Sequence, residues 1–140
     1  MILDKTLLFS DAQAITVTAA STNVIDLGVD RDLGQSDIDV LIQVLTAFTA
    51  AGAATLTIAL QTDNDEAFGS PTVLYTSAAI AVASLVVGFN PFKLKLPQTT
   101  ERYLRLSFTV TTGPMTAGAL TAGLITGRHD ARVYDAVTGV

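Results

Sequence analysis

The chain has 140 residues and a mass of 14.6 kDa, which is long enough for one domain with its own core. Hydrophobic residues make up 49% and charged residues 15%, and this balance excludes a disordered polypeptide. The net charge of -5 argues against a binder of nucleic acid, and the absence of cysteine excludes disulfides and thiolate metal sites.

The first fourteen residues mix apolar and charged side chains without clear alternation, so no strand is predicted over residues 1–14. They contain no cationic stretch followed by a long apolar run, so no signal peptide is expected. We expect the start of the chain to be a short arm that contacts a neighbouring subunit through Ile2, Leu3, Lys5, Leu7 and Phe9. The alternative is that this end is simply frayed.

Strands are predicted where apolar and polar residues alternate, or where β-branched residues cluster between turn signals. In chain order, the predicted strands cover residues 15–19, 23–27, 38–44, 56–60, 72–76, 80–87, 92–96, 103–110 and 116–126. The alternation is clearest over residues 103–110, where Leu104, Leu106 and Phe108 are expected to face a core. The Ala-rich stretch 47–54 is predicted to be a loop, because Gly52 and the alternation on either side fit a hairpin.

One predicted strand has two apolar faces. Val40, Ile42 and Val44 alternate along one face, but Leu41 and Leu45 make the opposite face apolar as well. A strand with this pattern is typically covered on both sides. We therefore expect another subunit to cover the second face.

Eight or nine short strands separated by turn signals predict an all-β fold. We expect an antiparallel two-sheet sandwich of the jelly-roll type with about eight strands. The predicted jelly-roll domain covers residues 1–126, including the short N-terminal arm, and residues 127–140 form a C-terminal tail. Side chains in the tail are also expected to contact a neighbour, unless the tail is frayed: Arg128, His129, Arg132 and Tyr134.

Three long segments carry no charge, and each is about long enough to cross a bilayer: residues 40–62, 72–92 and 106–127. The first and third contain glycines, and all three contain threonines. Such residues are typical of strands and turns rather than of a lipid-facing helix. We therefore predict no membrane partner.

No pattern predicts a catalytic, cofactor or metal site. The only histidine is His129 in the tail, and the Gly-x-Ser-x-Gly pattern of a nucleophile elbow is absent. The acidic loop at residues 63–66 does not match an EF-hand, because Ala67 and Phe68 stand where an oxygen ligand and a glycine are needed. A solvated turn is the favoured interpretation, and a looser calcium site is the alternative.

Other charged residues group along the chain without fixed geometry. Asp26, Asp30, Asp32, Asp37 and Asp39 form a second acidic cluster, which is predicted to be a solvated loop. A small basic patch on adjacent strands could fit an acidic protein partner, and its members are Lys93, Lys95, Arg102 and Arg105.

Several blocks of the sequence resemble a known family. They are Leu3-Asp4-Lys5, residues 9–14, residues 21–28, residues 54–63 running on to Ala67-Phe68, residues 102–106, and residues 116–125. In these blocks the chain resembles the small jelly-roll capsid cement (decoration) proteins of tailed bacteriophages, of the Bordetella-phage cement type.

The resemblance implies a structural virion protein that binds the outer surface of a phage capsid and clamps neighbouring major capsid protein subunits. It also implies a homo-oligomer, a dimer or trimer at a capsid symmetry axis, and it carries over no active-site residue or cofactor. The expected location is the exterior of the virion, after synthesis in the bacterial cytoplasm. The alternative is another phage head or tail sandwich that binds a host surface or glycan, and a carbohydrate-binding or hydrolase β-domain comes third.

Overall fold

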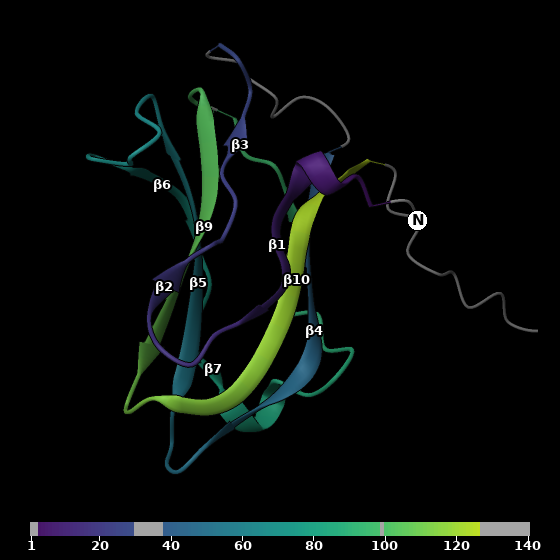
Figure 1. Ribbon diagram of the computed structural model, residues 1–140, viewed down its shortest axis with the longest axis vertical. Coiled ribbons are helices and arrows are strands. Elements are labelled where there is room, and N and C mark those ends of the chain that lie inside the picture. The colour runs from purple at the N-terminus through teal and green to yellow at the C-terminus, as the bar shows by residue number, and fades with distance from the viewer. Residues whose placement is uncertain (1–2, 30–37, 99, 127–140) are drawn as a thin grey trace, which may run out of the picture.

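The computed structural model describes residues 3–29, 38–98 and 100–126, and these residues form ten strands and two short 3-10 helices (Figure 1). Six of the strands have five or more residues: β1 (Leu8–Ala14), β4 (Ile38–Ala50), β5 (Thr55–Asp63), β6 (Thr72–Thr76), β9 (Tyr103–Thr111) and β10 (Met115–Thr126). Four have two residues: β2 (Ala19–Ala20), β3 (Ile25–Asp26), β7 (Ile80–Ala81) and β8 (Leu94–Lys95). The 3-10 helices are η1 (Lys5–Leu7) and η2 (Val82–Ser84).

The strands pair antiparallel in two sheets. Sheet A has the order β1-β10-β4-β8, and sheet B has the order β2-β9-β5-β6, with β3 also pairing with β9 and β7 with β5. Because β2 and β3 lie along one side of β9, and β6 and β7 along one side of β5, the ten strands occupy eight positions. The chain passes repeatedly from one sheet to the other, as the predicted jelly roll requires.

The core lies between the two sheets, and every long strand contributes to it by alternation. On β9, Leu104, Leu106 and Phe108 are fully buried, whereas Arg105 is half-buried and Thr109 is exposed. The predicted facing of this strand is confirmed. The fully buried core side chains also include Leu56, Ile58 and Leu60 of β5, Val40, Ile42 and Val44 of β4, and Leu120 of β10.

The second face of β4 is covered in part by the chain itself. Leu41 is buried and stands opposite Gly123 of β10, which in turn stands opposite Leu8 of β1. A Cβ atom on Gly123 would lie 2.8 Å from Cδ2 of Leu8, so the Leu8 side chain lies directly over this glycine. Leu45, further along β4, is 43% exposed. The chain therefore covers Leu41 itself, whereas the expected cover of Leu45 by a second subunit stays a prediction.

The beginning of the chain corrects the sequence analysis, because β1 is a strand where none was predicted. Its alternation is broken by Ser10, which is buried and donates a hydrogen bond of 2.6 Å to Oε1 of Gln13. Ala12 has a φ of 49°, and its N–H donates to Oγ1 of Thr121 on the neighbouring strand. Phe9 is fully buried in the core. Its side chain therefore cannot contact a neighbouring subunit, and that part of the predicted arm is wrong.

Other predicted boundaries also differ, and β3 covers only Ile25–Asp26 of the strand predicted over residues 23–27. The strand predicted over residues 15–19 begins only at Ala19, and the one over 80–87 ends at Ala81, where η2 follows. The strand predicted over 92–96 is limited to β8, and the predicted loop 47–54 starts later because β4 continues to Ala50.

The described residues of the three uncharged segments fold as strands, turns and the single-turn 3-10 helix η2, and not as a long helix. Residues 40–62 form most of β4 and β5, and residues 106–126 contain most of β9 and all of β10. No helix in the described part of the chain is long and apolar enough to cross a membrane.

Candidate interaction surface

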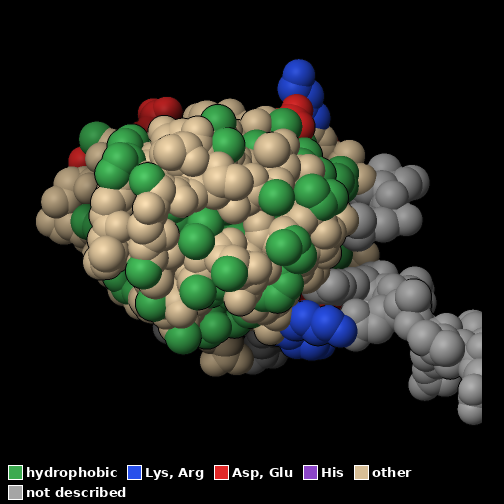
Figure 2. Space-filling view, turned by 90° about the horizontal axis from the view of Figure 1, so that it is seen from below, with side chains coloured by type: hydrophobic (Ala, Val, Ile, Leu, Met, Phe, Trp, Pro, Cys, Tyr) green, Lys and Arg blue, Asp and Glu red, His purple; other side chains and the backbone are tan. Residues whose placement is uncertain are grey.

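Among the residues that the structure describes, one end of the sandwich carries no charged side chain. It is built from residues 16–18, the β4–β5 turn, the segment 80–87 that contains β7 and η2, and the β9–β10 turn with its flanks. We call this surface the uncharged end. Figure 2, which views the molecule from below, shows hydrophobic and other uncharged side chains across this end, with Lys, Arg, Asp and Glu only at its margin. Parts of the three uncharged stretches of sequence therefore lie at one end of the sandwich.

Valine side chains stand out from the uncharged end into solvent. Val17 is 57% exposed, Val86 is 53% exposed and Val87 is 66% exposed. Beside Val17 is a shallow, open hollow of about 250 Å³, lined by Val17, Thr18, Val110, Gly113 and Pro114. Such a hollow is large enough to receive an apolar side chain from another protein.

Backbone hydrogen bonds hold the loops of the uncharged end to the sheets. The N–H of Met115 donates to the carbonyl oxygen of Thr16 at 2.8 Å, which fixes the loop beside the hollow. The N–H of Val82 donates to the carbonyl oxygen of Ala54 at 3.1 Å, which joins η2 to the β4–β5 turn. The N–H of Phe48 donates to the carbonyl oxygen of Leu85 at 2.9 Å. The surface is thus preorganised by the fold.

The opposite end of the sandwich carries charged residues that bind one another. Nε of Arg102 donates a hydrogen bond to Oδ1 of Asp26, and Nη2 of Arg102 donates one to Oδ2, each at 2.9 Å. This hydrogen bonding, together with that from the N–H of Gly28, lowers the pKa of Asp26 to about 2. The Arg102 guanidinium also lies 4.8 Å from the centre of the Tyr103 ring. The pair joins β3 to the start of β9.

The acidic loop after β5 uses its carboxylates to bind its own backbone. Asp63 accepts hydrogen bonds from the N–H groups of Asp65 at 3.0 Å and Ser70 at 3.1 Å, and both lower the pKa of Asp63. Asp65 accepts a bond of 3.0 Å from the N–H of Ala67. This is the self-bonded turn favoured by the sequence. Among the described residues, no group of three or more His, Cys, Asp or Glu is placed to hold a metal ion.

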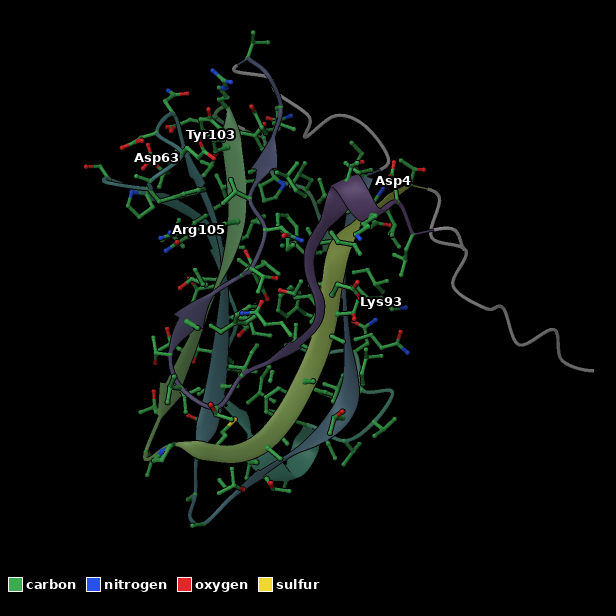
Figure 3. The ribbon with its side chains drawn as sticks, viewed as in Figure 1. Asp4, Asp63, Lys93, Tyr103 and Arg105 are labelled. Atoms are coloured by element: carbon green, nitrogen blue, oxygen red, sulfur yellow. The ribbon has the colours of Figure 1, made fainter. Side chains whose placement is uncertain are left out.

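The predicted basic patch does not form. Lys93 and Lys95 lie at β8, which pairs with β4 in sheet A, whereas Arg102 and Arg105 lie at β9 in sheet B. Figure 3 shows Lys93 and Arg105 on opposite sides of the sandwich. Arg105 donates a bond of 2.8 Å to Gln61, and its guanidinium lies 4.1 Å from the centre of the Phe68 ring. The sequence placed these residues on adjacent strands, but the fold separates β8 from β9.

The predicted contact residues differ in their exposure and in whether the structure describes them. Leu3 is 40% exposed and Lys5 is exposed, so a contact role for both stays a prediction. Leu7 is half-buried and packs against the core. Ile2, Arg128, His129, Arg132 and Tyr134 lie outside the described residues.

The sequence analysis missed the uncharged end as a candidate site. Its signal was present in the three uncharged segments, whose clustering at one end depends on the topology.

These features define an antiparallel jelly-roll sandwich with a preorganised, uncharged surface at one end. The family model Bbp16 matches residues 9–124, which is more than half of the chain. The chain therefore belongs to the Bbp16 family, a family of Bordetella phage proteins. No curated protein matches the chain. Family and fold together fit a structural protein of a phage.

Proposed function

We propose that this protein is a capsid cement protein, which binds the outer surface of a phage capsid and stabilises contacts between major capsid protein subunits. The observation that carries the proposal is the family match over residues 9–124, which covers most of the jelly-roll sandwich. The protein acts through its outer surfaces and catalyses no reaction. Its partners are the major capsid protein and further copies of itself, as a dimer or trimer at a capsid symmetry axis.

The sandwich is physically suited to this role because it is a rigid block. Both sheets contribute to a single core, so the shape of the outer surface is fixed before any contact forms. A preorganised surface loses little conformational entropy on binding. Because the cement protein would prefer the assembled lattice, its binding energy would stabilise that state by mass action. Several linked copies would be retained more strongly than each single contact allows.

The described surface favours a capsid-binding role over the alternative of a glycan-binding module. Glycan-binding surfaces commonly use exposed aromatic rings, which stack on the faces of sugars. In the described residues, the exposed large hydrophobic side chains are all leucine or valine. The aromatic residues there are at least partly buried, as with Tyr75, whose ring centre lies 4.9 Å from that of Phe92.

The direct test is to add the purified protein to mature heads that lack it. We expect the protein to sediment with the heads, to reach a saturating stoichiometry and to raise their melting temperature. Mass spectrometry of purified virions should give a copy number that matches this stoichiometry. Absence of binding to such heads would contradict the proposal, and retention on host cells or glycans instead would support the alternative.

A further inference from the structure

We infer that the uncharged end is the surface that contacts the capsid, and that it fits an uncharged, apolar patch of a protein. This inference rests on the proposed function and adds to it the orientation of the molecule and the chemistry of the partner surface. The charged end of the sandwich would then face solvent.

The distribution of charge decides which partner the uncharged end can accept. Residues 12–25, 40–62, 67–92 and 106–126 contain no Asp, Glu, Lys or Arg. A charged partner group buried against this end would lose its hydration and gain no opposite charge in return. Phosphates of nucleic acid and charged lipid headgroups are thereby disfavoured. The complementary surface is one that also lacks charge.

The uncharged end has a hollow that can accept a side chain of another protein. The hollow of about 250 Å³ has apolar side chains of Val17, Val110 and Pro114 in its lining. Val86 and Val87 add exposed apolar surface on another element, along the edge of β4, where the N–H of Gly88 donates to the carbonyl oxygen of Val44 at 2.9 Å. Apolar surface placed in this way gains free energy when another protein covers it.

In the described residues, the charged end also exposes valine side chains, at Val29 and Val73, but it carries charged groups that bind one another or the loop around them. Asp26 and Arg102 hydrogen-bond each other. Arg105 donates a hydrogen bond to Gln61, and its guanidinium lies over the Phe68 ring. Asp63 accepts hydrogen bonds from its own loop. Charged groups that bind one another and remain hydrated are typical of a surface that stays in contact with water.

The test places a negative charge on the uncharged end and, in a matched control, on the charged end. Val17→Glu and Val87→Glu alter the uncharged end, and Val73→Glu alters a side chain of β6 that is 51% exposed and stands opposite Gln61. All three valines are exposed, so each variant should keep the circular dichroism and melting temperature of the wild type.

We expect Val17→Glu and Val87→Glu to weaken binding to heads about tenfold or more, because each buries an unpaired charge in the contact. Val73→Glu should bind as the wild type does. Wild-type binding should change less than about threefold when NaCl rises from about 0.05 to about 0.5 M, because the contact contains no ion pair.

Three results would overturn the inference while leaving the proposed function intact. They are full binding by both uncharged-end variants, a steep loss of wild-type binding with salt, and an uncharged-end variant that loses only its oligomeric state, measured by light scattering, yet still binds heads. The last result would assign this end to contacts between copies. If the wild type fails to bind heads at all, the proposed function itself is wrong.

Discussion

At the scale of single residues, Gly118 of β10 approaches another side chain, the ring of Phe48 on β4, more closely than any other described glycine does. Gly118 has a φ of 141°, a region that side-chain-bearing residues rarely adopt, and a Cβ atom here would overlap the Phe48 ring. The ring is buried, and the backbone of Phe48 holds the segment after η2. This one glycine therefore lets β10 curve closely over β4 near the uncharged end.

We predict that Gly118→Ala lowers the free energy of unfolding by about 3 kcal/mol, because it combines overpacking with a strained backbone. Gly52 in the β4–β5 turn is the matched control, since a Cβ atom there would meet nothing within 4 Å. Gly52→Ala should change stability by about 1 kcal/mol or less. Urea denaturation measures both, and equal stabilities of the two variants would contradict this account.

A second prediction for single residues concerns the stability of the fold at acidic pH. Because Arg102 lowers the pKa of folded Asp26 to about 2, the unfolded chain takes up a proton first as the pH falls. The stability that Asp26 contributes is thus complete above about pH 4, the ordinary range of an aspartate, and is lost as the pH falls toward 2. Asp26→Asn should unfold at lower urea than the wild type at neutral pH, and this difference should disappear at pH 2.

The partner variant gives an independent check of the same pair. Arg102→Gln removes the main cause of the lowered pKa, so the wild-type advantage over Arg102→Gln should follow the same pH course. The pair is exposed to solvent, so the effect should also shrink in high salt. A difference between wild type and Asp26→Asn that persists unchanged down to pH 2 would show that the carboxylate matters for another reason.

At the scale of elements, β9 is the strand on which sheet B depends. It pairs with β5 from Thr55↔Thr111 to Asp63↔Tyr103 on one side, and with β2 and β3 on the other. Its inward side chains are fully buried from Leu104 to Phe108. A charge on the inward face of β9 should therefore disrupt the whole domain, whereas a charge on its outward face should be tolerated.

Leu106→Asp tests this facing directly. We predict a loss of roughly 4 kcal/mol or more, because an unpaired carboxylate replaces a fully buried leucine. That loss is most of the stability of an ordinary domain, so the variant should be unfolded or aggregated. Thr109→Asp, on the exposed face of the same strand, should cost about 1 kcal/mol or less. Circular dichroism distinguishes the two, and a folded Leu106→Asp protein would show that the facing is wrong.

The elements that the sequence predicted well are those whose own alternation decides their structure. β5 and β9 each keep an apolar face against the core, and this period is visible without any other strand. β1 could not be predicted, because hydrogen bonds to other side chains replace the usual alternation. The buried hydroxyl of Ser10 donates to Gln13, and the N–H of Ala12 donates to Thr121, a residue far away in the chain. Residues 80–87 were misjudged for a similar reason, since their partners are Ala54 of the β4–β5 turn and Phe48 of β4.

The candidate surface was predictable only in part. The uncharged segments are plain in the sequence, but the meeting of their turns at one end follows from the β4–β5 and β9–β10 connections, each of which passes from one sheet to the other. The basic patch failed because proximity along the chain, from Lys93 to Arg105, does not reveal that the chain changes sheets between β8 and β9. Pairing between distant strands is the information that local patterns lack.

At the scale of the whole molecule, the two sheets share one core and should unfold together. The core cluster contains residues of both sheets in mutual contact, including Ile42 and Leu120 from sheet A with Ile58 and Leu106 from sheet B. Neither sheet could keep its apolar face buried if the other were lost. The described fold therefore behaves as a single cooperative unit.

We predict one transition in urea, with the same midpoint whether it is followed by far-ultraviolet circular dichroism or by tyrosine fluorescence, since the protein has no tryptophan. Leu106→Ala, which leaves a cavity, should lower the free energy of unfolding by about 3 kcal/mol and move both midpoints together. Separate midpoints for the two signals would mean that the sheets unfold one after the other.

Strand β6 has a consequence for handling the protein. It lies at the margin of sheet B, and no described strand borders its other side. Its five residues, Thr72–Thr76, include neither lysine nor proline, the residues that commonly discourage edge-to-edge association. Stock solutions kept at high concentration away from virus particles should slowly form fibrous aggregates through this margin. A lysine placed at Val73 should lengthen their shelf life.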